Sequence, residues 1–183
     1  ASLSNIGGSV LHSGTGTFDI ATANILYSGG TAVTRGGLTL TAASWTNSGL
    51  IQAGRLTVNV GELTQTASGE LLATESFSGS GSNWVNHGRI ASDGSSALQL
   101  AGNYSGNGEL TTIAALTLVA GQVALNDSTR ISGGGLTTIA TSGALNNAGR
   151  LSSASDLGVN AAEVYNGGTL GAARDFTLTT GAL

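Results

Sequence analysis

Apolar and polar residues alternate along this chain in short stretches, which are separated by turns rich in Gly, Asn and Ser. The clearest motif consists of Gly, any residue, and then Leu or Ile, as in Gly49-Leu50-Ile51, and its last position is called the Leu or Ile step. Val10 holds the same place after Gly8-Ser9. From Ile51 this position returns at spacings of 20, 19, 20, 21, 20 and 19 residues, at Leu71, Ile90, Leu110, Ile131, Leu151 and Leu170. A regular period of this length is the signature of a repeat protein.

A second apolar signal, a pair of alternating residues, follows a few positions after each step. Its copies are Phe18/Ile20, Leu38/Leu40, Leu56/Val58, Leu98/Leu100, Leu116/Leu118, Leu157/Val159 and Phe176/Leu178, with Phe77 and Leu136/Thr138 as poorer copies. Alternation of this kind places one face of a strand inward and the other outward. Because one repeat of roughly 20 residues cannot bury its apolar face alone, consecutive repeats must stack.

The sequence therefore predicts an all-β solenoid, a parallel β-helix of about nine coils that forms a rod roughly 43 Å long at the usual strand spacing. The stretch 79–81 is predicted to be a loop that protrudes from an imperfect coil. A β-propeller would need about forty residues per blade, and the uniform single period favours the β-helix.

Turn and core columns follow from fixed offsets before the Leu or Ile step. Four positions before it we expect a recurring turn residue, because Asn and Asp tolerate turn conformations, at Asn47, Asn86, Asp127, Asn147 and Asn166. Six positions before it we expect a stacked, mostly apolar column at Trp45, Gln65, Trp84, Tyr104, Leu125, Leu145 and Val164.

Composition supports strands over helices. The 183 residues include thirty Gly and no Pro or Cys, only 9% are charged, and the formal net charge is −4. The absence of Pro suits strand ladders, which Pro would interrupt. Disordered chains combine low hydrophobicity with high net charge, so this composition indicates a chain that can bury a core. Six scattered Arg in an acidic chain argue against a nucleic-acid partner, and no apolar run is long enough for a membrane span.

Two segments carry a family resemblance. Leu145-Asn146-Asn147-Ala148-Gly149-Arg150-Leu151 with Asp156-Leu157-Gly158-Val159, and Trp45-Thr46-Asn47-Ser48-Gly49-Leu50-Ile51 with Gly54-Arg55-Leu56-Thr57-Val58, resemble the haemagglutinin repeats of filamentous haemagglutinins and contact-dependent growth inhibition exoproteins. The resemblance covers nearly the whole chain and is weakest over residues 1–35 and 72–83. It implies a right-handed parallel β-helix, two-partner secretion through an outer-membrane transporter, and a secreted or surface location. It also implies that residues 1–183 are a single repeat domain and an internal piece of a longer filament.

One column of charged residues precedes the Leu or Ile step on successive repeats. Its members are Glu70, Arg89, Glu109, Arg130 and Arg150, and neighbours would lie about 5 Å apart. The column could be a binding strip, but a solvated ion ladder worth about 0–1 kcal/mol per pair is the favoured interpretation.

Other candidate groups are sparser. Trp45, Trp84 and Tyr104 could form an aromatic ledge for sugars, with Trp84 and Tyr104 as its binding residues, although their column favours core packing. Asp156 and Asp175 could hold a hard cation, but a like-charge pair in water is favoured. His12 and His87 lie almost four coils apart, so no metal site or other cofactor is expected.

Three functions follow in order of preference. The first is a structural shaft that presents adhesive or toxin-delivery regions, and the chain is then not an enzyme. The second is a direct adhesin module that binds a receptor or glycan on a host or neighbouring cell. The third is a polysaccharide-active β-helix enzyme that uses Asp156 or Asp175. In each case uncapped ends should expose apolar core and favour end-to-end self-association.

Overall fold

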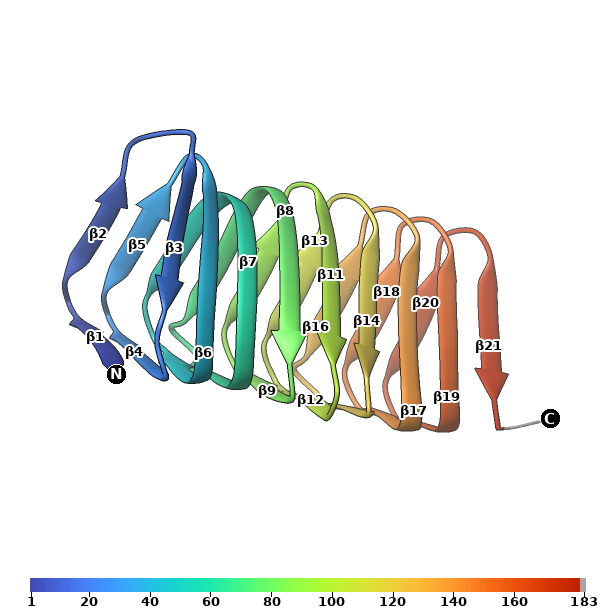
Figure 1. Cartoon of the computed structure of the whole chain (residues 1–183). Helices are drawn as coiled ribbons and strands as arrows, with labels where there is room; N and C mark the ends of the chain where they lie inside the picture. The colour runs from blue at the N-terminus through green and yellow to red at the C-terminus, as the bar shows by residue number, and fades with distance from the viewer. Residues whose placement is uncertain (182–183) are drawn as a thin grey trace.

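The chain winds into an elongated solenoid whose coils stack along one axis (Figure 1). The computed structural model describes residues 1–181, apart from the side chains of residues 26–28, and these residues contain strands but no helix. Nine coils follow one another, each with one strand segment on each of three faces, and every pairing between the strands is parallel. With the axis running toward the C-terminus, strands rise at the back and descend at the front in Figure 1, which is right-handed winding.

The three faces, here called A, B and C, follow one another within each coil. Face A consists of β1 (Ser2–Ile6), β4 (Asn24–Ser28), β9 (Asn83–Asn86), β12 (Asn103–Gly106), β15 (Gln122–Leu125) and the last parts of β6, β7, β17 and β19. Face B consists of β2 (Ser9–His12), β5 (Thr31–Thr34), β10 (Arg89–Ser92), β13 (Glu109–Thr112), β16 (Arg130–Gly133), β18 (Arg150–Ser153), β20 (Thr169–Ala172) and the first parts of β7 and β8. Face C consists of β3 (Thr17–Ala21), β11 (Ser95–Leu100), β14 (Leu116–Ala120), β21 (Phe176–Thr180), the first parts of β6 (Gly37–Asn47), β17 (Thr137–Asn147) and β19 (Leu157–Asn166), the middle of β7 (Leu50–Gln65) and the last part of β8 (Glu70–Gly81).

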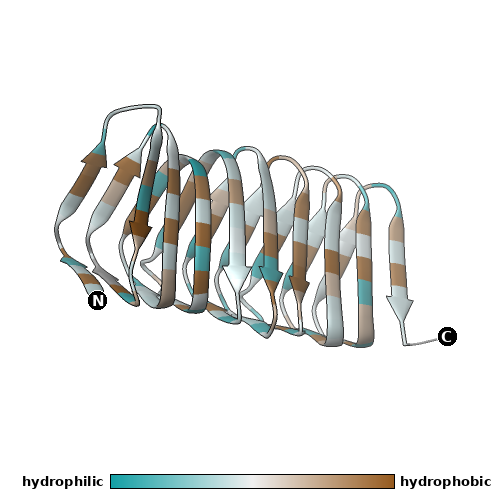
Figure 2. Ribbon diagram, viewed as in Figure 1, coloured by the Kyte–Doolittle hydropathy of each residue, from teal (hydrophilic) through white to brown (hydrophobic). Residues whose placement is uncertain are grey.

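The core consists of straight columns of equivalent side chains, as the repeat predicts. The Leu or Ile step forms one such column on face B, and the strand register joins its members in order: Val10, Ala32, Ile51, Leu71, Ile90, Leu110, Ile131, Leu151 and Leu170. Its members from Ile51 to Leu151 are fully buried. The same alternation appears as bands of apolar and polar colour along the strands (Figure 2). Each buried Leu or Ile contributes roughly 1.5–3 kcal/mol, which a coil gains only when it has neighbours.

Two copies of the second apolar pair are misplaced by the sequence pattern. The register pairs Phe77 with Ser96 and Ser96 with Leu116, so the pair that continues these two columns is Ser96/Leu98. Leu98 and Leu100 are both buried, as expected, but Leu100 belongs to the next inward column. In the seventh coil the inward residues are Thr137 and Ile139, and Leu136 lies on the outside, 52% exposed. The prediction failed because a small polar residue occupies the inward position in each case, and a nearby Leu offered a stronger hydrophobic signal.

The loop predicted for residues 79–81 is also wrong, because these residues continue strand β8. Gly79 stands in a core column between Val58 and Leu98, where other coils carry a large side chain. A Cβ on Gly79 would meet the ring of Trp84 at 2.4 Å. The missing side chain therefore makes room for the indole of the next coil, and the coil is complete.

The terminal coils leave core columns partly open. At the C-terminal end Phe176 is 46% and Leu178 is 47% exposed, although their columns are buried further inside. At the other end Phe18 and Ile20 are only partly buried. Each end of this chain therefore presents apolar side chains in the positions where a further coil would stack.

Candidate functional site

The proposed aromatic ledge does not exist. Trp84 is 0% and Tyr104 is 1% exposed, and the register stacks them in one column with Leu63 before and Val123 after. The indole N–H of Trp84 donates to the backbone oxygen of Val60 at 2.9 Å, and its ring meets Phe77 edge-on. Neither ring has a face available to a sugar, so the core interpretation is correct for both residues and their assignment as binding residues is wrong.

A ladder of buried side-chain amides runs along the corner between faces A and B. Asn47 donates to the Oε1 of Gln65 at 3.4 Å, Gln65 donates to the Oδ1 of Asn86 at 3.2 Å, and Asn86 donates to the hydroxyl oxygen of Tyr104 at 3.1 Å. Each of these amides also donates to a backbone oxygen of the next coil: Gln65 to that of Arg89, and Asn86 to that of Glu109. The ladder satisfies the corner's polar groups and joins the coils to one another.

This ladder corrects the fixed offsets taken from the sequence. Gln65 belongs to the amide column and Leu63 to the aromatic one, while Leu125 takes the place of an amide and Val123 lies in the core. Asp127 is an exposed turn residue outside the column. In these two coils the column positions lie two residues earlier than the fixed offsets predict. The reason is the length of the turn: four residues separate β7 from β8 and β15 from β16, whereas two separate β9 from β10.

Tyr104 ends the first section of the ladder. The next residue in the column, Gly106, has φ of +132° and lies so close to Asn86 that no side chain fits. Burial raises the pKa of Tyr104 to about 12, although the hydrogen bond with Asn86 acts in the opposite direction. The phenol is therefore a structural group that stays neutral across the physiological range.

The charged column lies on the outer side of face B, in the predicted order. The register stacks Glu70, Arg89, Glu109, Arg130 and Arg150 on consecutive coils. Arg89 approaches the carboxylate of Glu70 at 4.0 Å and Arg130 approaches that of Glu109 at 3.9 Å, with about half of each side chain exposed. Exposed pairs at this distance contribute roughly 0–1 kcal/mol each.

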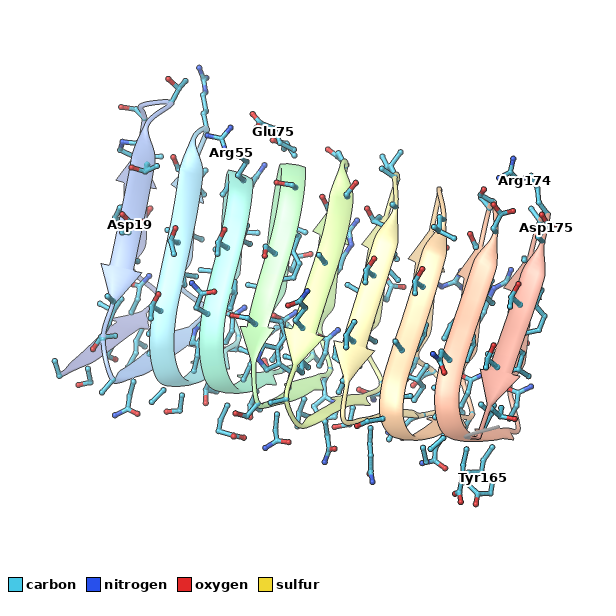
Figure 3. The ribbon with its side chains drawn as sticks, turned by 45° about the vertical axis from the view of Figure 1, so that its right-hand side comes forward. Asp19, Arg55, Glu75, Tyr165, Arg174 and Asp175 are labelled. Atoms are coloured by element: carbon cyan, nitrogen blue, oxygen red, sulfur yellow. The ribbon has the colours of Figure 1, made fainter. Side chains whose placement is uncertain are left out.

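The second acidic candidate is an ion pair. Arg174 donates two hydrogen bonds to Asp156, at 3.1 and 2.6 Å, and the backbone N–H of Asp175 donates a third at 3.2 Å. Arg174 and Asp175 lie together at the same edge of the last coil (Figure 3). These hydrogen bonds, first of all that from Arg174, lower the pKa of Asp156. A carboxyl held in this way stays ionised, whereas a general acid needs a raised pKa.

Among residues 1–181, with the side chains of 26–28 set aside, no three His, Asp or Glu side chains cluster so that they could hold a metal ion. The described part of the chain also has no helix that is long and apolar enough to cross a membrane. His87 lies on the surface beside Asn107, its Nδ1 at 2.5 Å from the amide oxygen.

The sequence interpretation missed one exposed aromatic residue. Tyr165 lies between inward Val164 and Asn166 on β19, and it is 59% exposed beside a surface hollow. Figure 3 shows its side chain projecting away from the last coil. Strand alternation around Val164 could have placed this ring outside.

Comparison with known proteins agrees with the repeat geometry. The haemagglutinin repeat family matches three overlapping stretches, residues 1–76, 51–149 and 116–183, which together span the chain. No curated protein and no solved structure matches it. The matched stretches span all nine coils, and the chain belongs to the haemagglutinin repeat family of the filamentous haemagglutinins.

Proposed function

We propose that this chain is part of the structural shaft of a bacterial filamentous adhesin or exoprotein, which holds adhesive or toxin-delivery regions away from the cell. The observation that carries the proposal is the unbroken face B column, fully buried from Ile51 to Leu151. Parallel ladders connect every coil to the next over the same length. Nine coils at the usual strand spacing span about 43 Å, and further coils would lengthen such a rod without changing its cross-section.

Export and location follow from the family. Haemagglutinin repeat proteins are typically secreted or surface-exposed. In our proposal the full-length protein leaves the cell through an outer-membrane two-partner secretion transporter, and this segment acts outside the cell without an enzymatic role. A receptor or glycan on a host or neighbouring cell is then the partner of the regions that the shaft presents, and residues 1–183 form one domain of that longer filament.

The shaft proposal is tested in the parent protein with an epitope tag placed beyond this segment. Removal of one whole coil, residues 90–109, keeps every column in phase, so the tag should remain on the surface at a slightly shorter reach. Leu110→Asp places a charge in the fully buried column and should stop folding beyond it, which exposes the segment to protease. Loss of tag display in both variants, or in neither, would contradict a role as a continuous shaft.

A second candidate function is a binding strip on face B. It is favoured by Arg150, which lies next to Arg130 and has no ion pair among the described residues. Two neighbouring cations could attract a carboxylate or sulfate group of a receptor. Binding of this chain to labelled acidic glycans should then weaken with salt and with the double change Arg130→Ala and Arg150→Ala, while Arg55→Ala serves as the control. Equal binding by both variants would remove this candidate.

A further inference from the structure

An open hollow of about 700 Å³ lies at the corner of faces A and B in the last three coils. It is lined by side chains from β15, β17, β19 and the turns that follow them: Ala124, Leu125, Asn126, Asn146, Asn147, Ala148, Val164, Tyr165, Asn166 and Gly167. The hollow is wide and largely open to solvent, so a ligand would lie along it and would not be enclosed. The lining contains four Asn side chains, one exposed aromatic ring and no charged group.

Tyr165 supplies the apolar surface of this hollow. It stands on the outside of the strand and is 59% exposed, more than any other Phe, Trp or Tyr side chain among residues 1–25 and 29–181. Its hydroxyl donates to the Oε2 of Glu163 at 2.8 Å, which holds the ring at its outer end. This hydrogen bond is the main cause of the raised pKa of Tyr165.

Asn147 gives an independent indication of a missing hydrogen-bond donor. Its Nδ2 donates to the Oδ1 of Asn166 at 2.7 Å and to the backbone oxygen of Thr169 at 3.1 Å, so the orientation of the amide is fixed. Its Oδ1 is buried and has no hydrogen-bond partner among the described residues. In the equivalent position Asn86 accepts hydrogen bonds from Gln65 and from the N–H of Gly88.

The preceding coil explains why Asn147 has no side-chain donor. Gln65 precedes Asn86 in the amide column, whereas apolar Leu125 precedes Asn147. Leu125 also lines the hollow. The ladder is therefore interrupted between Tyr104 and Asn147, beside the hollow. The buried Oδ1 of Asn147 is left without a donor, which costs about 1–3 kcal/mol. A hydroxyl that enters beside Asn147 is the kind of donor that would satisfy it.

We propose that this hollow binds a neutral carbohydrate. A sugar ring packs its apolar face on Tyr165, and its hydroxyl groups exchange hydrogen bonds with the amides of Asn126, Asn146 and Asn166. One further hydroxyl group donates to the Oδ1 of Asn147. Amides both donate and accept, which matches the hydroxyl groups of a sugar. An acidic glycan would find Glu163 beside the ring and no cation in the lining, and an apolar ligand would leave the amides without partners.

The test uses the whole chain, labelled with ¹⁵N, and neutral oligosaccharides of glucose, galactose or N-acetylglucosamine at millimolar concentration. Backbone and Asn side-chain amide signals of the last three coils should shift with at least one of these sugars. An equal concentration of an acidic oligosaccharide should leave the same signals in place. Signal shifts with the acidic sugar alone, or shifts confined to other coils, would overturn the proposal. The absence of any shift with all of the neutral sugars would also overturn it.

Matched variants separate stacking from folding. Tyr165→Ala should lower the affinity about tenfold, because it removes the one aromatic anchor of the site. Tyr165→Phe keeps the ring and should retain most of the affinity. Thr64→Ala, on the outside of the same face but in the fourth coil, should change nothing. If Tyr165→Ala binds as well as the natural chain while its spectrum remains folded, the ring has no part in binding and the inference fails.

Discussion

The amide ladder makes a quantitative prediction at Asn86. Its side chain is 2% exposed and takes part in four hydrogen bonds: with Gln65, Tyr104, the N–H of Gly88 and the backbone oxygen of Glu109. Asn86→Ala removes all four at once and leaves a small cavity at the corner. The change does not alter the apolar core columns, so its effect reports on the ladder.

The size of the effect follows from these partners. A hydrogen bond contributes about 1 kcal/mol net, so four give about 4 kcal/mol. Gln65 keeps its hydrogen bond to the backbone of Arg89, which reduces the loss. The buried N–H of Gly88, in contrast, loses its acceptor, which costs about 1–3 kcal/mol. We therefore expect Asn86→Ala to lower the free energy of unfolding by about 3–5 kcal/mol.

Urea unfolding followed by circular dichroism measures this change. Asn103→Ala is the matched control, because Asn103 is also on face A, one coil later, and its side chain is exposed. The control should stay within about 0.5 kcal/mol of the natural chain. Amide hydrogen exchange should show lost protection at Gly88 in Asn86→Ala alone. Equal unfolding midpoints for the two variants would refute the idea that the ladder stabilises the coils.

Three further predictions follow from the core, from Tyr104 and from the open ends. Gly79→Ala should destabilise the fold by about 1–3 kcal/mol in urea unfolding, because its Cβ would meet Trp84, while Gly158→Ala, with nothing within 4 Å, should be neutral or slightly stabilising; equal effects would contradict the packing argument. Because burial raises the pKa of Tyr104 to about 12, the neutral phenol's full contribution to the free energy of unfolding is present below about pH 10. Up to about 3 kcal/mol of it is lost as the pH rises from 10 toward 12, and urea unfolding at several pH values should show this loss in the natural chain and not in Tyr104→Phe. The open end at Phe176 should cause concentration-dependent association in analytical sedimentation, weakened by Phe176→Asp, and monodisperse monomers at high concentration would argue against it.

The candidate site divides into a part that the sequence placed and a part that it did not. The charged column was placed correctly, because each member comes directly before a step whose position in the coil never changes. Trp84 and Tyr104 were correctly placed in one column, but their assignment to a binding ledge was wrong. Tyr165 was missed because a single aromatic residue in one repeat has no counterpart in the other repeats.

The period of the repeat was determined by the sequence alone. One side chain per coil must return to the same column, so the Leu or Ile step fixes the number of coils, the all-β class and the parallel stacking. These features depend on local alternation and on a spacing that tolerates small variation. They can be predicted without coordinates.

The corners were decided only by the tertiary structure. Turns of two or four residues connect faces A and B, and both bring the chain back to the same column, so a fixed offset cannot tell which residue turns inward. The amide ladder, its interruption between Tyr104 and Asn147 and the hollow beside Tyr165 depend on contacts between residues about twenty positions apart. Such contacts depend on how each coil lies against the next, and the pattern within one repeat carries no record of them.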